Sequence, residues 1–305
     1  MRLEVLSHGE LRLDGGRPVR SASAIARFGD GWLIAQDDAT HAVWRRPDTT
    51  TPVRVLPPVD GNDTFSAAAG TKHLKPDLEA ACEVTVDGQQ AVLLLGSGST
   101  PARMNAALVL LDPAGPRSVT ADLTPLYLAV ARALGIEPTH LNLEGACRHD
   151  RRLRWFQRGN SAADVPSASV DVDLAALLGV IAGEGRAETV PLQDVRRYDL
   201  GRVGGVSLAI TDAVTMPRGR TLLSAAAEDT PNAVDDGPVV GAALSLVDGD
   251  RVLGTAPLPR VDGQIYKVEG LAVPELLADG ARLLAVVDVD DPGSASLELA
   301  LRLWW

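Results

Sequence analysis

The chain has 305 residues, which is enough for a large hydrophobic core and for one large domain or two ordinary ones. Its 29 basic and 40 acidic side chains give a formal net charge of −11, which argues against nucleic acid or an anionic membrane surface as a partner. No stretch has the length of an apolar membrane span, and the first residues lack the basic end and apolar run of a secretory signal. We therefore expect a cytoplasmic protein.

A short unit recurs five times along the chain, at intervals of 56 to 65 residues. Each copy has a strand-like opening, a polar turn that mostly contains Gly or Asp, and a second apolar run. A repeat of this length, with short strands and polar turns, is typical of a β-propeller with enlarged loops. The five openings begin at Ser23, Glu79, Glu144, Ser207 and Glu269.

The two ends of the chain indicate how such a ring closes. After the fifth unit only one further strand remains, over residues 296–305, so the last blade lacks its outer strand. The strand-like segment 1–13 can supply that strand and remove the free sheet edges. We predict an all-β, five-bladed propeller that occupies residues 1–305 as a single domain. A sixth blade is the alternative, if residues 164–199 contain a degenerate unit.

The predicted blades account for nearly the whole chain. They cover residues 21–59, 78–121, 143–199, 206–260, and 266–305 together with 1–13. The connection 60–77 is long for a propeller and carries Lys72, His73 and Lys75, which makes it a candidate functional loop.

Two short helices are expected as insertions on one face of the ring. Residues 122–135 contain Pro125 in the first turn, apolar residues at helical spacing, and Gly135 as a stop. Residues 173–182 are rich in Ala and Leu and lack the alternation of a strand.

Three of the five openings begin with a glutamate at the same repeat position: Glu79, Glu144 and Glu269. Since the innermost strands of a propeller line its channel, we expect these carboxylates to meet at one rim, where they repel one another and lose hydration. A divalent cation, most simply Ca²⁺, would neutralise them. Lys75 and Lys267 each precede a glutamate and allow ion pairing instead. Hydrogen bonds to the backbone of neighbouring blades, or acid–base catalysis, are the remaining alternatives.

Other polar residues are predicted on the same rim. His73 and His140 lie in the loops before the second and third openings and are the histidines best placed for proton transfer. Arg158 can form a two-pronged contact with a carboxylate or a phosphate. The predicted substrate-binding residues are Lys75, Asn142, Arg158, Asn160 and Lys267. The ends of the second strands and the loop 227–236 add Asp37, Asp38, Ser97, Ser99, Glu228, Asp229, Asp235, Asp236, Asp288 and Asp290.

Short phrases around the glutamates resemble those of known propellers. They read Leu-Glu-Ala-Ala from Leu78, Leu-Glu-Gly-Ala from Leu143 and Val-Glu-Gly-Leu from Val268. With these phrases the chain resembles bacterial phytase-like and SdiA-regulated-type propellers. It is most similar to an uncharacterised family that shares the phrases matched here by residues 141–146 and 157–160.

That resemblance implies a propeller, often with calcium in or near the channel, and, for phytases, hydrolysis of phosphomonoesters. The three glutamates are also similar to the three channel acids of five-bladed glycosidases, in which the separation of the carboxylates distinguishes their roles.

These observations lead to two hypotheses of different classes. The first is a metal-assisted hydrolase or lyase for a small polar substrate at the channel mouth, in which the three glutamates hold a divalent cation or act as acid and base. One of the two histidines then moves a proton, and the basic and amide side chains orient the substrate. The second is a non-catalytic module that binds a metabolite or a protein. An exposed apolar patch on the rim favours the module, whereas buried groups with perturbed pKa values favour the enzyme.

Overall fold

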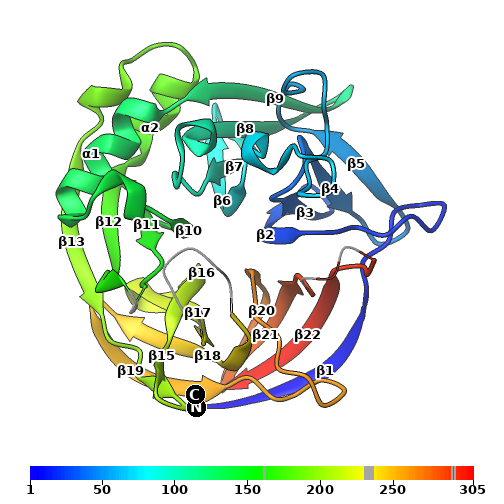
Figure 1. Ribbon diagram of the computed structural model, residues 1–305, viewed down its shortest axis with the longest axis vertical. Helices are drawn as coiled ribbons and strands as arrows, with labels where there is room; N and C mark the ends of the chain where they lie inside the picture. The colour runs from blue at the N-terminus through cyan, green and yellow to red at the C-terminus, as the bar shows by residue number, and fades with distance from the viewer. Residues whose placement is uncertain (161–162, 230–236, 290, 292) are drawn as a thin grey trace.

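Five four-stranded antiparallel sheets are arranged in a closed ring around a central axis in the computed structural model (Figure 1). The structure describes residues 1–160, 163–229, 237–289, 291 and 293–305. Each sheet is one blade, and each innermost strand contacts the innermost strands of both neighbouring blades. The prediction of an all-β, five-bladed propeller is therefore confirmed.

The blades are numbered here in chain order, and their strands are given from the innermost outwards. Blade one contains β2 (Ala22–Phe28), β3 (Gly31–Gln36), β4 (His41–Arg45) and β5 (Thr50–Arg54). Blade two contains β6 (Leu78–Val86), β7 (Gln89–Gly96), β8 (Asn105–Asp112) and β9 (Gly115–Asp122). Blade three contains β10 (Leu143–His149), β11 (Arg152–Gln157), β12 (Ser167–Asp173) and β13 (Leu192–Tyr198). Blade four contains β16 (Ala209–Met216), β17 (Arg220–Glu228), β18 (Val239–Asp248) and β19 (Arg251–Pro257).

Blade five joins the two ends of the chain. Its strands are β20 (Gly270–Leu277), β21 (Gly280–Val287), β22 (Leu297–Trp304) and, outermost, β1 (Arg2–Glu10). The pairing of β1 with β22 is antiparallel and places Leu3 opposite Leu303. The predicted closure by the N-terminal strand is confirmed. Residues 164–199 form the outer part of blade three, so the six-bladed alternative is wrong.

A β-bulge occurs at the start of every inner strand. In blades one to four the pairing register with the second strand shifts by one residue, and the extra residue is Ser23, Glu79, Glu144 or Thr211. In blade five the Glu269 N–H donates to the carbonyl of Val286, which also lies opposite Gly270. The glutamates predicted at one repeat position are thus equivalent in three dimensions.

Blade four departs from the predicted alignment by four residues. Thr211 occupies the bulge position, whereas Ser207 lies in β15 (Val206–Ser207), which pairs with β14 (Arg202–Val203) in a separate two-stranded sheet. The apolar run 208–210 resembles the opening of an inner strand, which explains the misalignment. The Thr211 hydroxyl donates to the Val268 carbonyl of blade five at 2.6 Å, just as the Ser23 hydroxyl donates to Leu78 of blade two at 2.5 Å.

Two helices fill the wedge between blades two and three. The helix α1 (Thr124–Leu134) ends at Gly135 in a left-handed conformation, and α2 (Leu174–Ile181) begins after Asp173, whose carboxylate accepts the Ala176 N–H. Both helices were predicted. The chain enters α1 from the rim where the inner strands begin. It enters α2 beside Arg151 at the opposite rim, so the helices approach the wedge from different faces.

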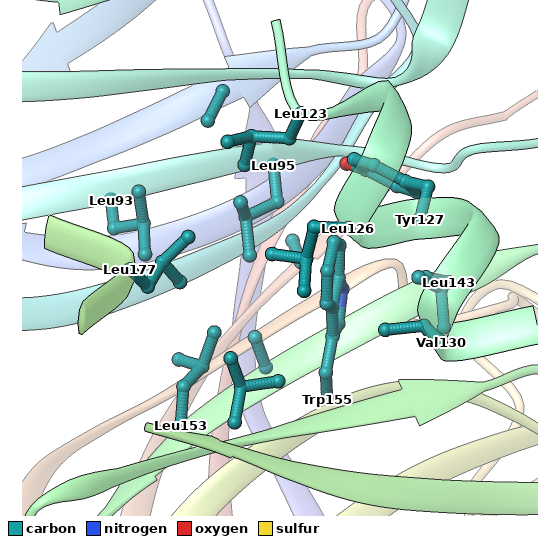
Figure 2. Close-up of a cluster of buried hydrophobic side chains, with 14 of the residues drawn as sticks. Leu93, Leu95, Leu123, Leu126, Tyr127, Val130, Leu143, Leu153, Trp155 and Leu177 are labelled. Atoms are coloured by element: carbon teal, nitrogen blue, oxygen red, sulfur yellow. The ribbon is translucent and has the colours of Figure 1, made fainter. Parts of the chain in front are cut away.

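The core of this wedge surrounds Trp155 (Figure 2). The ring of Tyr127 from α1 lies edge-on to this tryptophan, with 4.7 Å between ring centroids. Leu126 from α1 and Leu177 from α2 are fully buried in the same cluster.

Neither of the two α-helices nor any other helix among the described residues has the length and apolar character of a membrane span.

Ring closure by β1 makes a prediction for stability. Leu3 is 8% exposed and packs with Leu301 and Leu303, whereas Leu6 on the same strand is 46% exposed. We expect Leu3→Ala to lower the free energy of unfolding by about 2–5 kcal/mol, because it leaves a cavity in the closing blade. Leu6→Ala should change it by less than about 0.5 kcal/mol. Urea unfolding measures both, and equal effects of the two substitutions would contradict the packed closure.

Candidate functional site

The bulges place polar side chains on the rim at which the inner strands begin. The residue two positions before each bulged glutamate is also polar: Asp77 before Glu79, Asn142 before Glu144, and Lys267 before Glu269. The loops that follow the second strands reach the same rim. There the backbone N–H groups of Asp37, Ser97 and Arg158 donate to the carbonyls of Ser21, Asp77 and Asn142. These equivalent hydrogen bonds give three blades the same rim geometry.

Three carboxylates from blades one and two form the carboxylate triad: Asp37, Asp77 and Glu79. One oxygen from each residue lies within 4.8 Å of the others. Asp37 directly follows β3, Asp77 directly precedes β6, and Glu79 is the bulged residue of β6. The Asp77 N–H donates to the Asp37 carbonyl at 3.0 Å, so the backbone itself holds the two aspartates together.

Basic and hydroxyl groups surround this triad. The Lys75 ammonium lies 2.5 Å from Asp37 Oδ2 and 2.6 Å from Asp77 Oδ1. The other oxygen of Asp77, Oδ2, accepts from Arg103 Nη1 at 2.9 Å and from the Ser97 hydroxyl at 2.5 Å. Among the described residues, no cationic group lies within 4.0 Å of the Glu79 carboxylate. Glu79 is therefore the triad member without an ion pair.

Blades three to five contribute a second group, the ion-pair cluster, which consists of Glu144, Arg158, Glu228, Lys267 and Glu269. Arg158 lies between two carboxylates, at 2.9 Å from Glu144 and 2.7 Å from Glu228. Lys267 likewise lies between Glu228 at 3.2 Å and Glu269 at 2.9 Å. The Asn142 amide donates to Glu144 at 2.7 Å. Each basic side chain of this cluster is thus held by two acids.

Carboxylates outnumber cations in the triad and the ion-pair cluster taken together. The six acids are Asp37, Asp77, Glu79, Glu144, Glu228 and Glu269, and the four bases are Lys75, Arg103, Arg158 and Lys267. If all ten groups were ionised, they would carry two uncompensated negative charges. Buried charges are costly unless they are balanced, so the site requires protons or a bound cation.

The pKa shifts agree with this imbalance. Burial, reinforced by the negative charges of Asp77 and Asp37, raises the pKa of Glu79 well above its usual range. Burial also raises the pKa of Glu269 to about 8, although Lys267 opposes the change. The pKa of Asp38, next to the triad, is raised to about 6 by burial and by the charge of Asp37. Such shifts are typical of functional sites, although ion-pair networks also produce them.

The structure separates the predicted metal ligands. Only Glu79 lies in the carboxylate triad, whereas Glu144 and Glu269 are paired with Arg158 and Lys267. Lys75 is held by the triad. The predicted substrate ligands Asn142, Arg158 and Lys267 belong to the ion-pair cluster or contact it.

The two predicted histidines lie outside both groups. His73 and His140 are exposed, on the one-turn helices η1 (Lys72–Leu74) and η3 (Pro138–His140). Asn160 follows β11, and its N–H donates to the Val165 carbonyl. Asp235, Asp236 and Asp290 lie outside the described residues.

Sequence reasoning missed two residues of the site, Asp77 and Arg103. Asp77 stands two positions before Glu79, as Asn142 and Lys267 do before their glutamates, so the repeat contained a signal for it. Arg103 ends the one-turn helix η2 (Pro101–Arg103) in a loop that has no repeat equivalent. Nothing local distinguishes it from a surface arginine.

The raised pKa of Glu269 predicts a pH-dependent stability. The folded state holds the Glu269 proton up to a pH of about 8, whereas the unfolded chain releases it near 4.5. This carboxyl therefore contributes most to stability below pH 4.5, and its contribution falls as the pH rises to about 8. As the pH rises from 4.5 to about 8, the free energy of unfolding of wild type should fall relative to that of Glu269→Gln. Above a pH of about 8, the difference between the two proteins should stay constant.

Urea unfolding at several pH values measures this difference. Glu275→Gln is a matched control, because Glu275 lies on the same inner strand but forms an exposed pair with Arg282. We expect no comparable trend for it. A difference between wild type and Glu269→Gln that does not change with pH would contradict the shifted pKa.

The solved structures that match this chain are distant from it in sequence. A luciferin-regenerating enzyme matches with 8% identity and a TM-score of 0.43, covering 97% of this chain and 96% of its own. The catalytic domain of a GH62 α-L-arabinofuranosidase from Coprinopsis cinerea matches with 11% identity and a TM-score of 0.42, covering 96% and 95%. The N-terminal domain of Nup159 matches with 9% identity and a TM-score of 0.33, covering 92% and 75%. Residues 71–292, which include most of the rim residues, match a family of unknown function (DUF6910), and the chain belongs to this family.

Proposed function

We propose that the protein is a metal-assisted hydrolase or lyase that acts on a small polar substrate at the channel mouth. In this proposal Asp37, Asp77 and Glu79 hold one divalent cation. The observation that carries it is the carboxylate triad, with oxygens from two blades within 4.8 Å of one another. Two oxygens that bind the same Ca²⁺ at 2.3–2.6 Å lie at most about 5 Å apart, so this spacing suits one shared ion.

The charge balance of the rim supports the same proposal. A divalent cation would compensate the two negative charges by which the six carboxylates exceed the four bases. Hard cations such as Ca²⁺ prefer carboxylate and carbonyl oxygens, which are the groups present here. When bound, such an ion polarises a carbonyl or phosphoryl oxygen of a substrate.

Glu269 is the best candidate for proton transfer. With a pKa raised to about 8, close to neutral pH, it can exchange a proton with a leaving group or with water. Lys267 holds its carboxylate in place from 2.9 Å. Glu144, fixed by Arg158 and Asn142, then serves to position these groups.

A cleft of about 430 Å³ lies beside Lys267 on the same rim. Its wall includes Gln264, Tyr266 and Asp288. The volume suits a small molecule, and the amide, phenol and carboxylate groups suit a polar one. Asp288, in the wall of this cleft, also contributes to the raised pKa of Asp38 in blade one.

Phosphomonoesters are the first substrate class to test, because the glutamate phrases resemble those of phytase-like propellers. Lactones and glycosides are the next. A protein-binding module is less well supported. The large exposed apolar side chains among the described residues lie on strands or at the chain ends, not in the rim loops: Met1, Leu6, Val195, Leu253, Leu276 and Trp305.

The cation proposal is tested by calorimetric titration of metal-free protein with Ca²⁺ and Mn²⁺. We expect one ion per chain, a higher melting temperature with the ion, and reversal by EDTA. Glu79→Gln should weaken binding at least about ten-fold, because it removes a charged ligand. Glu83→Gln is the matched control on the same strand, since Glu83 lies outside the triad and accepts the Arg27 N–H. Absence of binding, or equal binding by the two variants, would contradict the proposal.

The catalytic part of the proposal needs a separate experiment. The cation-loaded protein is incubated with phosphomonoesters, lactones and glycosides, and turnover is compared between wild type and Glu269→Gln. We expect turnover of one class, at least about 100-fold slower in the variant, because general acid–base catalysis contributes roughly 10²–10⁴-fold. A cation-binding protein that turns over none of these classes would favour the binding module.

A further inference from the structure

We infer that Lys75 is an intramolecular competitor of the cation: its ammonium group occupies the position of the ion between Asp37 and Asp77 and leaves that position when the ion binds. This inference rests on the proposed cation site and concerns how that site is loaded. The ammonium nitrogen lies 2.5 Å from Asp37 Oδ2 and 2.6 Å from Asp77 Oδ1. These separations fall within the range of Ca²⁺–oxygen distances, roughly 2.3–2.6 Å. An ion bound to the same two oxygens would therefore coincide with the nitrogen.

Asp77 has no second oxygen free for the ion. Its Oδ2 already accepts hydrogen bonds from Ser97 and Arg103, at 2.5 and 2.9 Å. Asp77 Oδ1, which contacts Lys75, is the oxygen that remains for a cation. The ion and the ammonium group thus require the same ligand atom.

Asp77 is also held too firmly to turn away from Lys75. The residue is 3% exposed and has a left-handed backbone, with φ of 54°. Its N–H donates to the Asp37 carbonyl, and its own carbonyl accepts the Ser97 N–H. Of the two partners, the flexible lysine is the one that can move.

The surroundings of Lys75 allow that movement. The residue follows the one-turn helix η1, in which Lys72 and His73 are exposed to solvent. A lysine side chain has a flexible four-carbon stem, so its ammonium group can reach water without a change in the inner strand. Arg103, by contrast, remains bound to Asp77 and to the Ser99 hydroxyl.

Charge repulsion favours exchange over joint occupancy. The Lys75 nitrogen lies 2.5 Å from Asp37 Oδ2 and 2.6 Å from Asp77 Oδ1, the two oxygens that the ion would bind. An ion on these oxygens would therefore lie directly beside the ammonium group if Lys75 stayed. Like charges so close together in a partly buried site repel strongly, so the ion displaces the lysine. Lys75 therefore acts as a substitute cation that forms ion pairs with both aspartates until an ion binds.

The binding test compares wild type with Lys75→Met, which removes the charge and keeps most of the side-chain length. Calorimetric titration with Ca²⁺ and Mn²⁺ should show a Kd lowered about 10- to 100-fold in the variant, if the lysine blocks the site in about 90–99% of ion-free molecules. Lys72→Met, an exposed neighbour in the same loop, is the matched control and should leave the Kd unchanged. Without ions Lys75→Met should melt lower than wild type, and the ion should raise its melting temperature more.

The outcomes separate the two proposals. An unchanged or higher Kd in Lys75→Met, while wild type binds the ion, would overturn the competition and leave the cation site intact. Binding by Lys75→Met alone would show that Lys75 never leaves the site in wild type, which would overturn the exchange and the proposal that the natural chain holds a cation. Binding by neither protein would reject the cation site and the competition with it.

A second measurement uses the wild-type protein and does not depend on the folding of a variant. The chain contains only three lysines, Lys72, Lys75 and Lys267, so lysine-labelled protein gives three side-chain NMR signals. Saturating Ca²⁺ should move the Lys75 signal toward that of the exposed Lys72. Lys267, held by Glu228 and Glu269, should not move. A Lys75 signal that stays in place while the ion binds would overturn the inference.

Discussion

The bulge at the start of each inner strand is the constraint on which the rest of the site depends. It involves two consecutive residues: the first is Ser, Thr or Glu, and in blades three and five the second faces the backbone of the next inner strand. There is little room for the second. A Cβ on Gly145 would lie 2.9 Å from the Ala213 nitrogen, and one on Gly270 would lie 2.8 Å from the backbone of Ala24. A polar residue followed by a small one is therefore the pattern that ring closure favours.

Blade four shows how the same constraint accommodates an exception. Its second residue is Asp212, which is 2% exposed and accepts the Leu271 N–H of blade five at 2.6 Å. Burial raises the pKa of this carboxyl well above its usual range, so the neutral form is favoured. With Thr211 at the bulge, blade four contributes backbone ties between blades rather than a rim carboxylate.

Loops from different blades then determine what each glutamate does. Glu269 is paired with Lys267, which lies two positions before it in the chain. Glu144 is paired with Arg158, which directly follows the second strand of blade three. Glu79 faces Asp37 and Asp77 instead, because Lys75 is already shared by the two aspartates. The same repeat position thus forms ion pairs in blades three and five and carries a carboxylate without an ion pair in blade two. That asymmetry places the candidate cation site between blades one and two.

The number of blades, the closing strand and both helices could be predicted from the amino-acid sequence. These features follow from the repeat, the turn residues and the helix ends, all of which are patterns along the chain. The sequence also placed Glu79, Glu144 and Glu269 on one rim. The three-dimensional fold was needed to show that Thr211, not Ser207, completes the repeat, and that Asp77 and Arg103 belong to the site. Partner choice depends on distances between loops of different blades, and residue spacing along the chain contains no information about those distances.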